Sequence, residues 1–218
     1  MRFRDRVQAG HLLAERLACY AGRPEVIVLG LPRGGVLVAA QVARELDAPL
    51  DVLVVRKLGV PGHEELAMGA IASGGIRVLN DDVIRSLWID PARFEGVAEA
   101  ETLELERREK TFRGDRPALD LRGRIVILVD DGVATGCTIR AAARAARQCG
   151  PVRLVVAVPV APPEFAAGVD LPADEIVCLL QPESLRAVGQ WYEEFPQTTD
   201  EEVRDALAET RATSGARS

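Results

Sequence analysis

The sequence predicts an α/β protein of one domain, built on a central, mostly parallel sheet with helices on both faces. Three observations support this fold class. Several short runs are apolar at every position and rich in valine and isoleucine, which is typical of strands buried on both faces. Stretches with helical character separate these runs. The chain has 218 residues, of which 48% are hydrophobic and 28% charged, a composition that suits one globular core.

The first half of the chain contains two predicted strands of this sheet. Glu25–Leu31 (EVIVLGL) is the first, and the amphipathic stretch Gly35–Leu46 is the helix that follows it. Asp51–Val55 (DVLVV) is the second strand. The glycine-rich residues 58–75 are predicted to be a loop with room for a small hairpin. Asp81–Leu87 starts with an acidic cap and predicts a short helix.

The middle of the chain carries the strongest strand pattern. Pro91–Arg113 predicts a long, highly charged helix, because proline suits the first helical turn. This helix either packs beside the loop before it or forms an interface. A linker over Gly114–Gly123 leads to Arg124–Val129 (RIVILV), the most apolar of the predicted strands. A helix over residues 138–148 follows, and then the strand Val152–Val158.

The last part of the chain adds one strand and one helix. Three prolines, Pro159, Pro162 and Pro163, are predicted to break the chain after the preceding strand. Glu175–Leu180 (EIVCLL) is the last predicted parallel strand. Residues 200–209 predict a helix, and residues 211–218 predict a frayed tail.

Composition excludes several functional classes. The net charge is −6 and the isoelectric point is near 5.1, which disfavours a nucleic-acid binder. The four cysteines form no CxxC pair and the chain has two histidines, so no zinc motif is present and a reducing compartment is indicated. The charged N-terminus is unlike a signal peptide, and the apolar runs are far shorter than the roughly 18 residues of a membrane span. We therefore expect a cytoplasmic protein that binds neither nucleic acid nor membrane.

Two acids and a small-residue loop follow the strongest strand. Asp130 and Asp131 come at its carboxyl end, where parallel sheets bind ligands. Ionised carboxylates only accept hydrogen bonds, so the pair suits the hydroxyls of a sugar diol. The segment Ala134–Thr138 has little bulk and precedes a helix, whose free N–H groups can hold a phosphate. The spacing of the two elements matches one ribose 5-phosphate.

This segment, VILVDDGVATGCT, resembles the signature of the type I phosphoribosyltransferases. The resemblance covers about residues 25–195 of a domain that we place at residues 1–210. It implies that Asp130 and Asp131 hold the ribose hydroxyls of phosphoribosyl pyrophosphate (PRPP) and act as catalytic residues. It also implies five residues at the 5′-phosphate: Ala134, Thr135, Gly136, Cys137 and Thr138. Gly132 departs from the family, which usually has an aliphatic residue there.

Two other interpretations of the acid pair stay open. A paired aspartate after an apolar strand also occurs in phospho-acceptor receiver domains. In those domains the pair lies on the first strand, whereas here it lies past the middle of the chain. The second alternative is a degenerate loop that has kept the shape of the site without its activity.

Two further loops are expected to hold the pyrophosphate. In Leu31-Pro-Arg-Gly-Gly35 a cation precedes two glycines that let the backbone approach an anion, so Arg33 and Gly34 are candidate pyrophosphate ligands. In the resembling family this loop often contains a cis non-proline peptide, and the candidate bond is Pro32–Arg33.

The second of these loops follows the strand Asp51–Val55. Arg56 and Lys57 come next, and Lys57 is one of only two lysines in the chain. Its compact ammonium suits a leaving pyrophosphate, so Lys57 is also a candidate catalytic residue. The loop Val60–Gly75 resembles the flexible lid of the family. His63 on it is either a proton donor or phosphate contact, or an exposed loop residue.

A variable hood selects the acceptor in this family, and Leu185–Phe195 resembles a hood strand with its following loop. Val188, Trp191 and Tyr192 are the candidate acceptor contacts. An aromatic side chain here could stack on a heterocyclic base, or the cluster could pack the C-terminal lobe or a dimer contact. The N-terminal helix around His11–Tyr20 either contributes to the hood or flanks the sheet.

The resemblance implies transfer of the 5-phosphoribosyl group from PRPP to a nitrogenous base, with release of pyrophosphate. Magnesium is expected to be held through PRPP rather than by direct protein ligands. The 6-oxopurine enzymes have an acid at the position of Ala134 and a lysine at that of Cys137, so their substrates are disfavoured. A non-catalytic PRPP or nucleotide regulator and a PRPP hydrolase are the alternatives. A homodimer is expected from the family.

Overall fold

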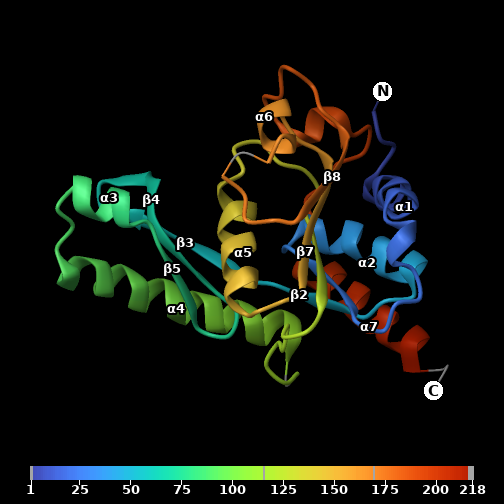
Figure 1. Ribbon diagram of the computed structural model, residues 1–218, viewed down its shortest axis with the longest axis horizontal. Helices are drawn as coiled ribbons and strands as arrows, with labels where there is room; N and C mark the ends of the chain where they lie inside the picture. The colour runs from blue at the N-terminus through green and yellow to red at the C-terminus, as the bar shows by residue number, and fades with distance from the viewer. Residues whose placement is uncertain (1, 115, 169, 216–218) are drawn as a thin grey trace.

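The computed structural model describes residues 2–114, 116–168 and 170–215, with a five-stranded sheet at its centre (Figure 1). The strands lie in the order β2 (Leu50–Val52), β1 (Val26–Gly30), β6 (Ile125–Val129), β7 (Arg153–Val160) and β8 (Glu175–Leu180). All four pairs of neighbours are parallel. The predicted fold class is therefore confirmed.

Helices cover both faces of this sheet. The helical elements outside the projecting arm described below are α1 (Arg6–Arg16), η1 (Ala18–Tyr20), α2 (Gly34–Leu46), α5 (Cys137–Gln148), α6 (Pro163–Ala166), η2 (Val188–Trp191) and α7 (Asp200–Gly215). Alternate residues of the strands point to opposite faces. Val28 and Ile127 pack in one core with α1, α2 and α7, while Leu29 and Leu128 pack in a second core with α5 and α6. Burial on both faces explains why these strands are apolar throughout.

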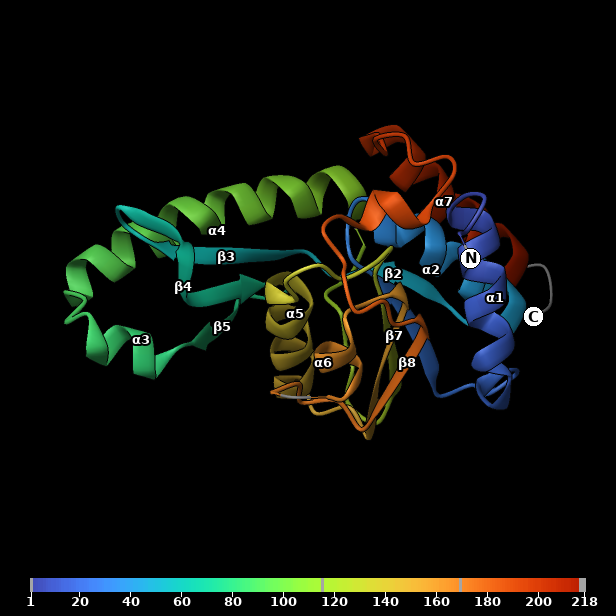
Figure 2. The ribbon, with the colours of Figure 1, turned by 90° about the horizontal axis from the view of Figure 1, so that it is seen from above.

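A second, antiparallel sheet replaces most of the predicted loop over residues 58–75. It consists of β3 (Val55–Val60), β4 (His63–Ala72) and β5 (Ile76–Leu79). With α3 (Asp81–Ser86) and α4 (Pro91–Arg113) it forms an arm that projects from the main sheet (Figure 2). The predicted loop is thus wrong in extent, although β3 and β4 form the hairpin for which the prediction left room, and the low strand propensity of glycine and alanine explains the difference. Met68 and Ile71 are buried in the same core as Ala98 and Leu105 of α4, so distant residues supply the apolar cover.

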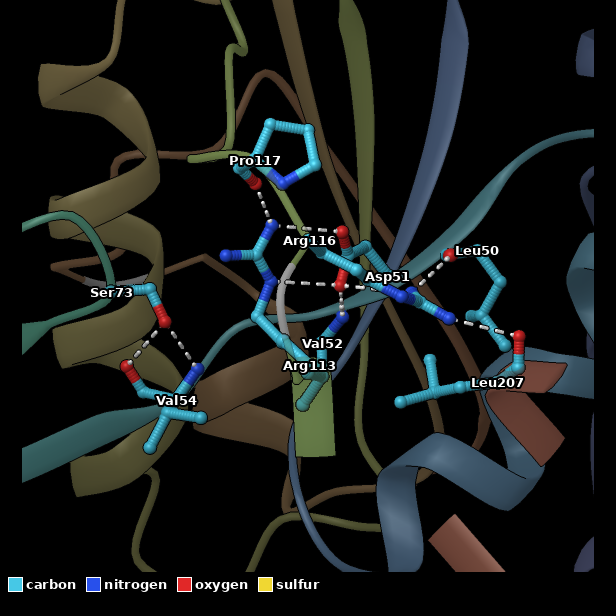
Figure 3. Close-up of polar contacts among 9 residues, drawn as sticks. All are labelled: Leu50, Asp51, Val52, Val54, Ser73, Arg113, Arg116, Pro117 and Leu207. Atoms are coloured by element: carbon cyan, nitrogen blue, oxygen red, sulfur yellow. Dashed lines mark hydrogen bonds and ion pairs between the residues drawn. The ribbon is translucent and has the colours of Figure 1, made fainter. Parts of the chain in front are cut away.

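Two other boundaries differ from the sequence prediction. The second strand ends at Val52, and Ser73 fixes the bend that follows it: the Val54 N–H donates to Ser73 Oγ at 3.0 Å, and the Ser73 N–H donates to the Val54 carbonyl at 2.9 Å (Figure 3). Pro159 lies inside β7 instead of breaking it. Beyond Ala157, which pairs with the last residue of β6, strand β7 is paired on one side only, so a missing N–H donor is tolerated there.

The C-terminal end of α4 is tied to the main sheet by a buried ion cluster (Figure 3). Both carboxylate oxygens of Asp51 on β2 accept hydrogen bonds from Arg113, each at 3.1 Å, and Arg116 lies 3.3 Å from Oδ1. Arg116 also donates to the carbonyl of Leu207 on α7 at 3.0 Å. The cluster therefore joins the arm, the edge strand and the last helix. The long helix Pro91–Arg113 thus packs along the arm sheet and ends at this cluster.

The C-terminal helix is longer than predicted. It runs from Asp200 to Gly215, and residues 216–218 of the predicted tail lie outside the described residues. Within the described part of the chain, no helix combines the length and the apolar character that crossing a lipid bilayer requires.

Replacing Asp51 with asparagine tests the cluster. The side chains of Asp51, Arg113 and Arg116 are only 14%, 9% and 9% exposed, so the variant removes the carboxylate that pairs with both of these buried guanidinium groups. We expect Asp51→Asn to lower the free energy of unfolding by about 3 kcal/mol in urea titrations. Asp82→Asn removes a partner from the exposed Arg85 pair and should leave stability unchanged. Equal stabilities for the two variants would contradict the role of the cluster.

Candidate functional site

The loops after β1 and β6 lie side by side because these two strands are neighbours in register. Gly30 pairs with Val129, the last residue before Asp130. The chain after β1 then passes directly over the acid pair: a Cβ on Gly34 would collide with Asp131 Oδ2, and one on Gly35 would lie 2.8 Å from the Asp130 Cα. Only glycine fits at this approach. The Pro32–Arg33 peptide is cis, as the sequence predicted.

Both aspartates are largely but not fully buried, and each has one carboxylate oxygen held by the protein. The Asp131 N–H donates to Asp130 Oδ1 at 2.9 Å, and Arg6 Nε donates to Asp131 Oδ2 at 2.9 Å. Burial raises the pKa of both carboxyl groups, and that of Asp130 is also raised by the neighbouring charge of Asp131. Arg6 opposes both shifts. Ionisation of the pair is thus unfavourable in this site, and the positive charge of Arg6 offsets part of that cost.

The small-residue loop forms a cradle beside the acid pair. Gly136 caps α5 with a φ of +79°, and the helix starts at Cys137. A cavity of about 190 Å³ is lined by Asp130, residues 132–139 and Val188. It therefore brings together Asp130 and all five residues predicted to contact the 5′-phosphate. The N–H groups of the first helical turn have no carbonyl partner within a helix, which makes such a cradle suitable for an anion.

Gly132 has a steric reason in this structure. A Cβ on it would lie 2.5 Å from Val188 Cγ1 and 2.9 Å from Val160 Cγ1. Val188 of η2 thus fills the volume that an aliphatic side chain at position 132 would need. The glycine lets the hood approach the loop of the acid pair.

The structure does not place the predicted cations of β3 beside the acid pair. Arg56 and Lys57 lie inside β3 on the arm, and Arg56 Nε donates to Glu101 of α4 at 2.6 Å. Neither lines the cavity of the cradle or a second cavity described below. His63 is exposed at the start of β4. Of the predicted pyrophosphate ligands, Arg33 and Gly34 are the ones that the fold brings to the acid pair.

The predicted hood strand is not formed. Residues 188–191 form the short 3₁₀ helix η2, and Tyr192 makes a single bridge with Phe3. The bridge cannot extend into a ladder because the N-terminal chain turns into α1 at Arg6. The Tyr192 ring packs between Phe3 and Phe195, with ring centroids 5.3 and 4.8 Å apart, and its hydroxyl donates to the Asp131 carbonyl at 2.6 Å.

The three candidate hood residues therefore differ in what they can reach. Tyr192 is buried in packing, and Val188 lines the cradle. Trp191 is half-buried, and its indole Nε1 has no hydrogen-bond partner among the described residues.

Sequence reasoning missed Arg6 and the segment after Phe195. A second cavity, of about 370 Å³, is lined by Arg6, Arg33, Gly34, Phe195, Pro196, Gln197 and Thr198. It adjoins Asp131 through Arg6 and Gly34. Arg6 lies in the N-terminal run Arg-Phe-Arg-Asp-Arg, whose charges are typical of a solvated segment. The sequence carries no local pattern that would have paired it with a residue 125 positions away.

Comparisons with known proteins agree with this fold. A family model described as a phosphoribosyl transferase domain matches residues 6–181. The chain belongs to this family. Two curated proteins from Mycobacterium tuberculosis strains CDC 1551 and H37Rv, both named as candidate phosphoribosyl transferases, are 53% identical over 201 residues. These matches cover 92% of this chain and 45% of theirs, so the chain spans about half the length of the curated relatives it matches.

A solved structure is also similar over nearly the whole chain. The crystal structure of TT1426 from Thermus thermophilus has a TM-score of 0.86 and 47% sequence identity. The match covers 96% of this chain and 99% of that one. The arm and the hood therefore lie within the region over which the two folds correspond.

The buried charge of Asp130 predicts a distinctive pH dependence of stability. Because its pKa is raised on folding, the folded protein binds more protons than the unfolded chain between the two pKa values, so stability rises as the pH falls through that window. Asp130→Asn removes this term while its amide oxygen can still accept the Asp131 N–H. We expect the variant to unfold at a higher temperature than the wild type at pH 8, with the difference shrinking towards pH 5.

The control for this measurement is Asp120→Asn, which removes the same charge from a largely exposed side chain. It should show no such pH-dependent gain. If Asp130→Asn were less stable than the wild type at pH 8, the assignment of a destabilising buried charge would be wrong.

Proposed function

We propose that this protein transfers the 5-phosphoribosyl group from PRPP to a nitrogenous base and releases pyrophosphate. The single observation that carries the proposal is the acid pair lying between an anion cradle and a glycine-backed cationic loop. Family membership supports the same reaction class. Because the chain spans about half of its curated relatives, the activity is a proposal for this chain in its own right.

The cradle is proposed to bind the 5′-phosphate. Its five residues from Ala134 to Thr138 line one cavity with Asp130. The helix dipole of α5 and the free N–H groups at its start favour a dianion there. Arg140 supports this shape, since its Nη1 donates to the Thr135 carbonyl at 3.0 Å.

The acid pair is proposed to bind the ribose hydroxyls. The Asp131 N–H and Arg6 occupy Asp130 Oδ1 and Asp131 Oδ2. Among the described residues, no other residue donates a hydrogen bond to Asp130 Oδ2 or Asp131 Oδ1, so one oxygen of each acid can accept from a sugar hydroxyl. Two acceptors on adjacent residues fit a vicinal diol.

Pyrophosphate is proposed to lie against Arg33 and the backbone of Gly34, in the cavity next to Asp131. Arg56 and Lys57 would join only if the arm sheet moved towards the acid pair, and Arg56 would then have to leave Glu101. The catalytic role of Lys57 therefore stays a prediction that depends on this movement.

The reaction needs positioning and charge rather than a protein nucleophile. Loss of pyrophosphate develops positive charge on the sugar, as in glycoside cleavage. The carboxylates of Asp130 and Asp131 lie where they can stabilise this charge, the cradle anchors the 5′-phosphate, and the hood limits access of water.

Magnesium fits this arrangement as a partner of the substrate. No cluster of three or more histidine, cysteine or acidic residues that could hold a metal occurs in the part of the chain the structure describes. Magnesium is commonly held by few protein ligands together with substrate phosphates, so we propose that it is held through PRPP and not by direct protein ligands. When bound with PRPP it would neutralise pyrophosphate oxygens.

The acceptor is proposed to be a nitrogenous base other than a 6-oxopurine. Ala134 and Cys137 stand where those enzymes carry an acid and a lysine. Val188, which lines the cradle, and Trp191 are the hood residues that we propose to contact the base. We also propose a cytoplasmic location. The protein is further proposed to be a homodimer, and gel filtration with light scattering can test this oligomeric state.

Calorimetric titration with PRPP, with and without magnesium, tests the proposal. We expect the wild type to bind PRPP at micromolar concentrations and the double variant Asp130→Asn with Asp131→Asn to lose binding. A neutral amide oxygen accepts a hydrogen bond from a sugar hydroxyl more weakly than a carboxylate oxygen does. The variant should keep its circular dichroism spectrum. Equal affinity in wild type and variant would overturn the assignment of the acids.

Product analysis then separates the functional classes. Pyrophosphate release that requires a base supports the transferase, and release without a base indicates a hydrolase. Binding without turnover across a panel of bases indicates a regulator. No binding at millimolar PRPP would overturn the proposed substrate.

A further inference from the structure

Arg6 is a buried cation that lies outside the signature segment and contacts Asp131 within it. It is the first residue of α1, and its side chain is only 9% exposed. Its Nε donates to Asp131 Oδ2 at 2.9 Å, and its Nη1 donates to the carbonyl of Pro196 at 2.8 Å. Its guanidinium carbon lies 3.8 Å from the centroid of the Phe195 ring. Contacts on three sides thus fix the guanidinium.

We propose that Arg6 is a positioning residue for the reaction: it supplies the counter-charge next to Asp131 and turns one carboxylate oxygen, Oδ1, towards the sugar. This inference rests on the proposed function, in which Asp131 accepts from a ribose hydroxyl. It goes beyond that function because it assigns a role to a residue of the N-terminal helix.

Geometry restricts how Asp131 can point. The absence of a side chain on Gly34 leaves the space that Oδ2 occupies, and Arg6 holds Oδ2 there. The Tyr192 hydroxyl fixes the backbone of the same residue by donating to its carbonyl at 2.6 Å. With Oδ2 and the backbone both held, the remaining freedom of the carboxylate is small. Oδ1 is then presented in one direction.

Charge explains why the partner is arginine. Asp130 and Asp131 are adjacent and buried, and two close carboxylates in a low-dielectric site do not both stay ionised without a counter-charge. Among the described residues, Arg6 is the cation that forms an ion pair with either acid. An arginine stays charged at every pH of interest and is the residue best suited to buried pairs.

Four other titratable or charged groups lie around the ion pair of Arg6 and Asp131. Asp130 faces Asp131 from the same loop, and Tyr192 contacts it from the hood. Glu202 of α7 lies close enough to Arg6 to interact with its charge, and Arg33 lines the same cavity as Arg6. A change at Arg6 should therefore act first on the two aspartates.

The test compares Arg6→Gln and Arg6→Lys with the wild type in PRPP titrations from pH 5.5 to 9. Removing the positive charge should weaken PRPP binding at least about tenfold at pH 7. The affinity for PRPP should decrease as the pH is lowered and Asp131 becomes protonated. In Arg6→Gln this decrease should begin at a higher pH, because Asp131 then binds a proton more readily. Arg6→Lys keeps the positive charge, so its affinity and its pH profile should both lie between those of Arg6→Gln and the wild type. Arg4→Gln is the matched control, since Arg4 lies in the same segment but its side chain is 62% exposed.

A second readout needs no ligand. Titration of ¹³C-labelled aspartate carboxyl groups by NMR follows Asp131 in the free protein, assigned by comparison with Asp131→Asn. The Asp131 resonance should titrate at a higher pH in Arg6→Gln than in the wild type. This measurement decides the role of Arg6 even if the wild type does not bind PRPP, an outcome that would overturn only the proposed function.

Three results would overturn the inference. The first is an unchanged affinity and pH profile in Arg6→Gln. The second is tighter binding in that variant, which would mean that Arg6 blocks the sugar site. The third is failure of both Arg6 variants to fold at 20 °C while Arg4→Gln folds, which would make Arg6 a structural residue.

Discussion

Burial of two adjacent carboxylates at the end of one strand is the constraint around which the site is arranged. Burial raises the pKa of both Asp130 and Asp131, and the neighbouring charge of Asp131 raises that of Asp130 further. One backbone N–H and one guanidinium compensate them, each holding a single oxygen. The neighbouring β1 loop can approach this pair only because glycine occupies positions 34 and 35.

The N-terminal segment packs together with the hood next to the acid pair. Backbone hydrogen bonds join Phe3 to Trp191 and Glu193, each at 2.8 Å, so the N-terminal segment and the hood form one layer. Arg6 reaches from this layer to Asp131, and Tyr192 reaches the carbonyl of the same residue. The layer formed by the N-terminal segment and the hood thus contributes one cation and one hydrogen bond to the surroundings of Asp131.

The arm has a separate structural basis. Its sheet is buried against α4, and the Asp51 cluster anchors the end of that helix to β2 and α7. Helix α5 connects the arm to the site, because it starts at the cradle and packs against β3, β4 and β5. A cavity of about 160 Å³ between the arm and α5 is lined by Cys137, Arg140 and Asn80, among others. A movement of the arm would therefore act on the same helix that forms the cradle.

The sequence by itself determined the parallel sheet, most of its helices, and the segment that forms the cradle. These features depend on local patterns: continuous apolar runs for β1, β6, β7 and β8, a proline at the start of α4, and two acids followed by small residues after β6. Each pattern reports the surroundings of its own residues, so a single stretch of sequence is sufficient to find it. The cis peptide at Pro32–Arg33 followed from the resemblance of the loop.

Tertiary structure alone decided the arm, the hood and the partner of Asp131. Strand β4 of the arm is rich in glycine and alanine, and helix α4, about thirty residues further on, packs in the same core as its buried residues Met68 and Ile71. The bridge that joins the hood to the N-terminal segment is formed by Tyr192 and Phe3, which are far apart in the sequence. Arg6 contacts Asp131 across 125 positions. Such contacts depend on which surfaces the folded chain brings together, and no local periodicity encodes that.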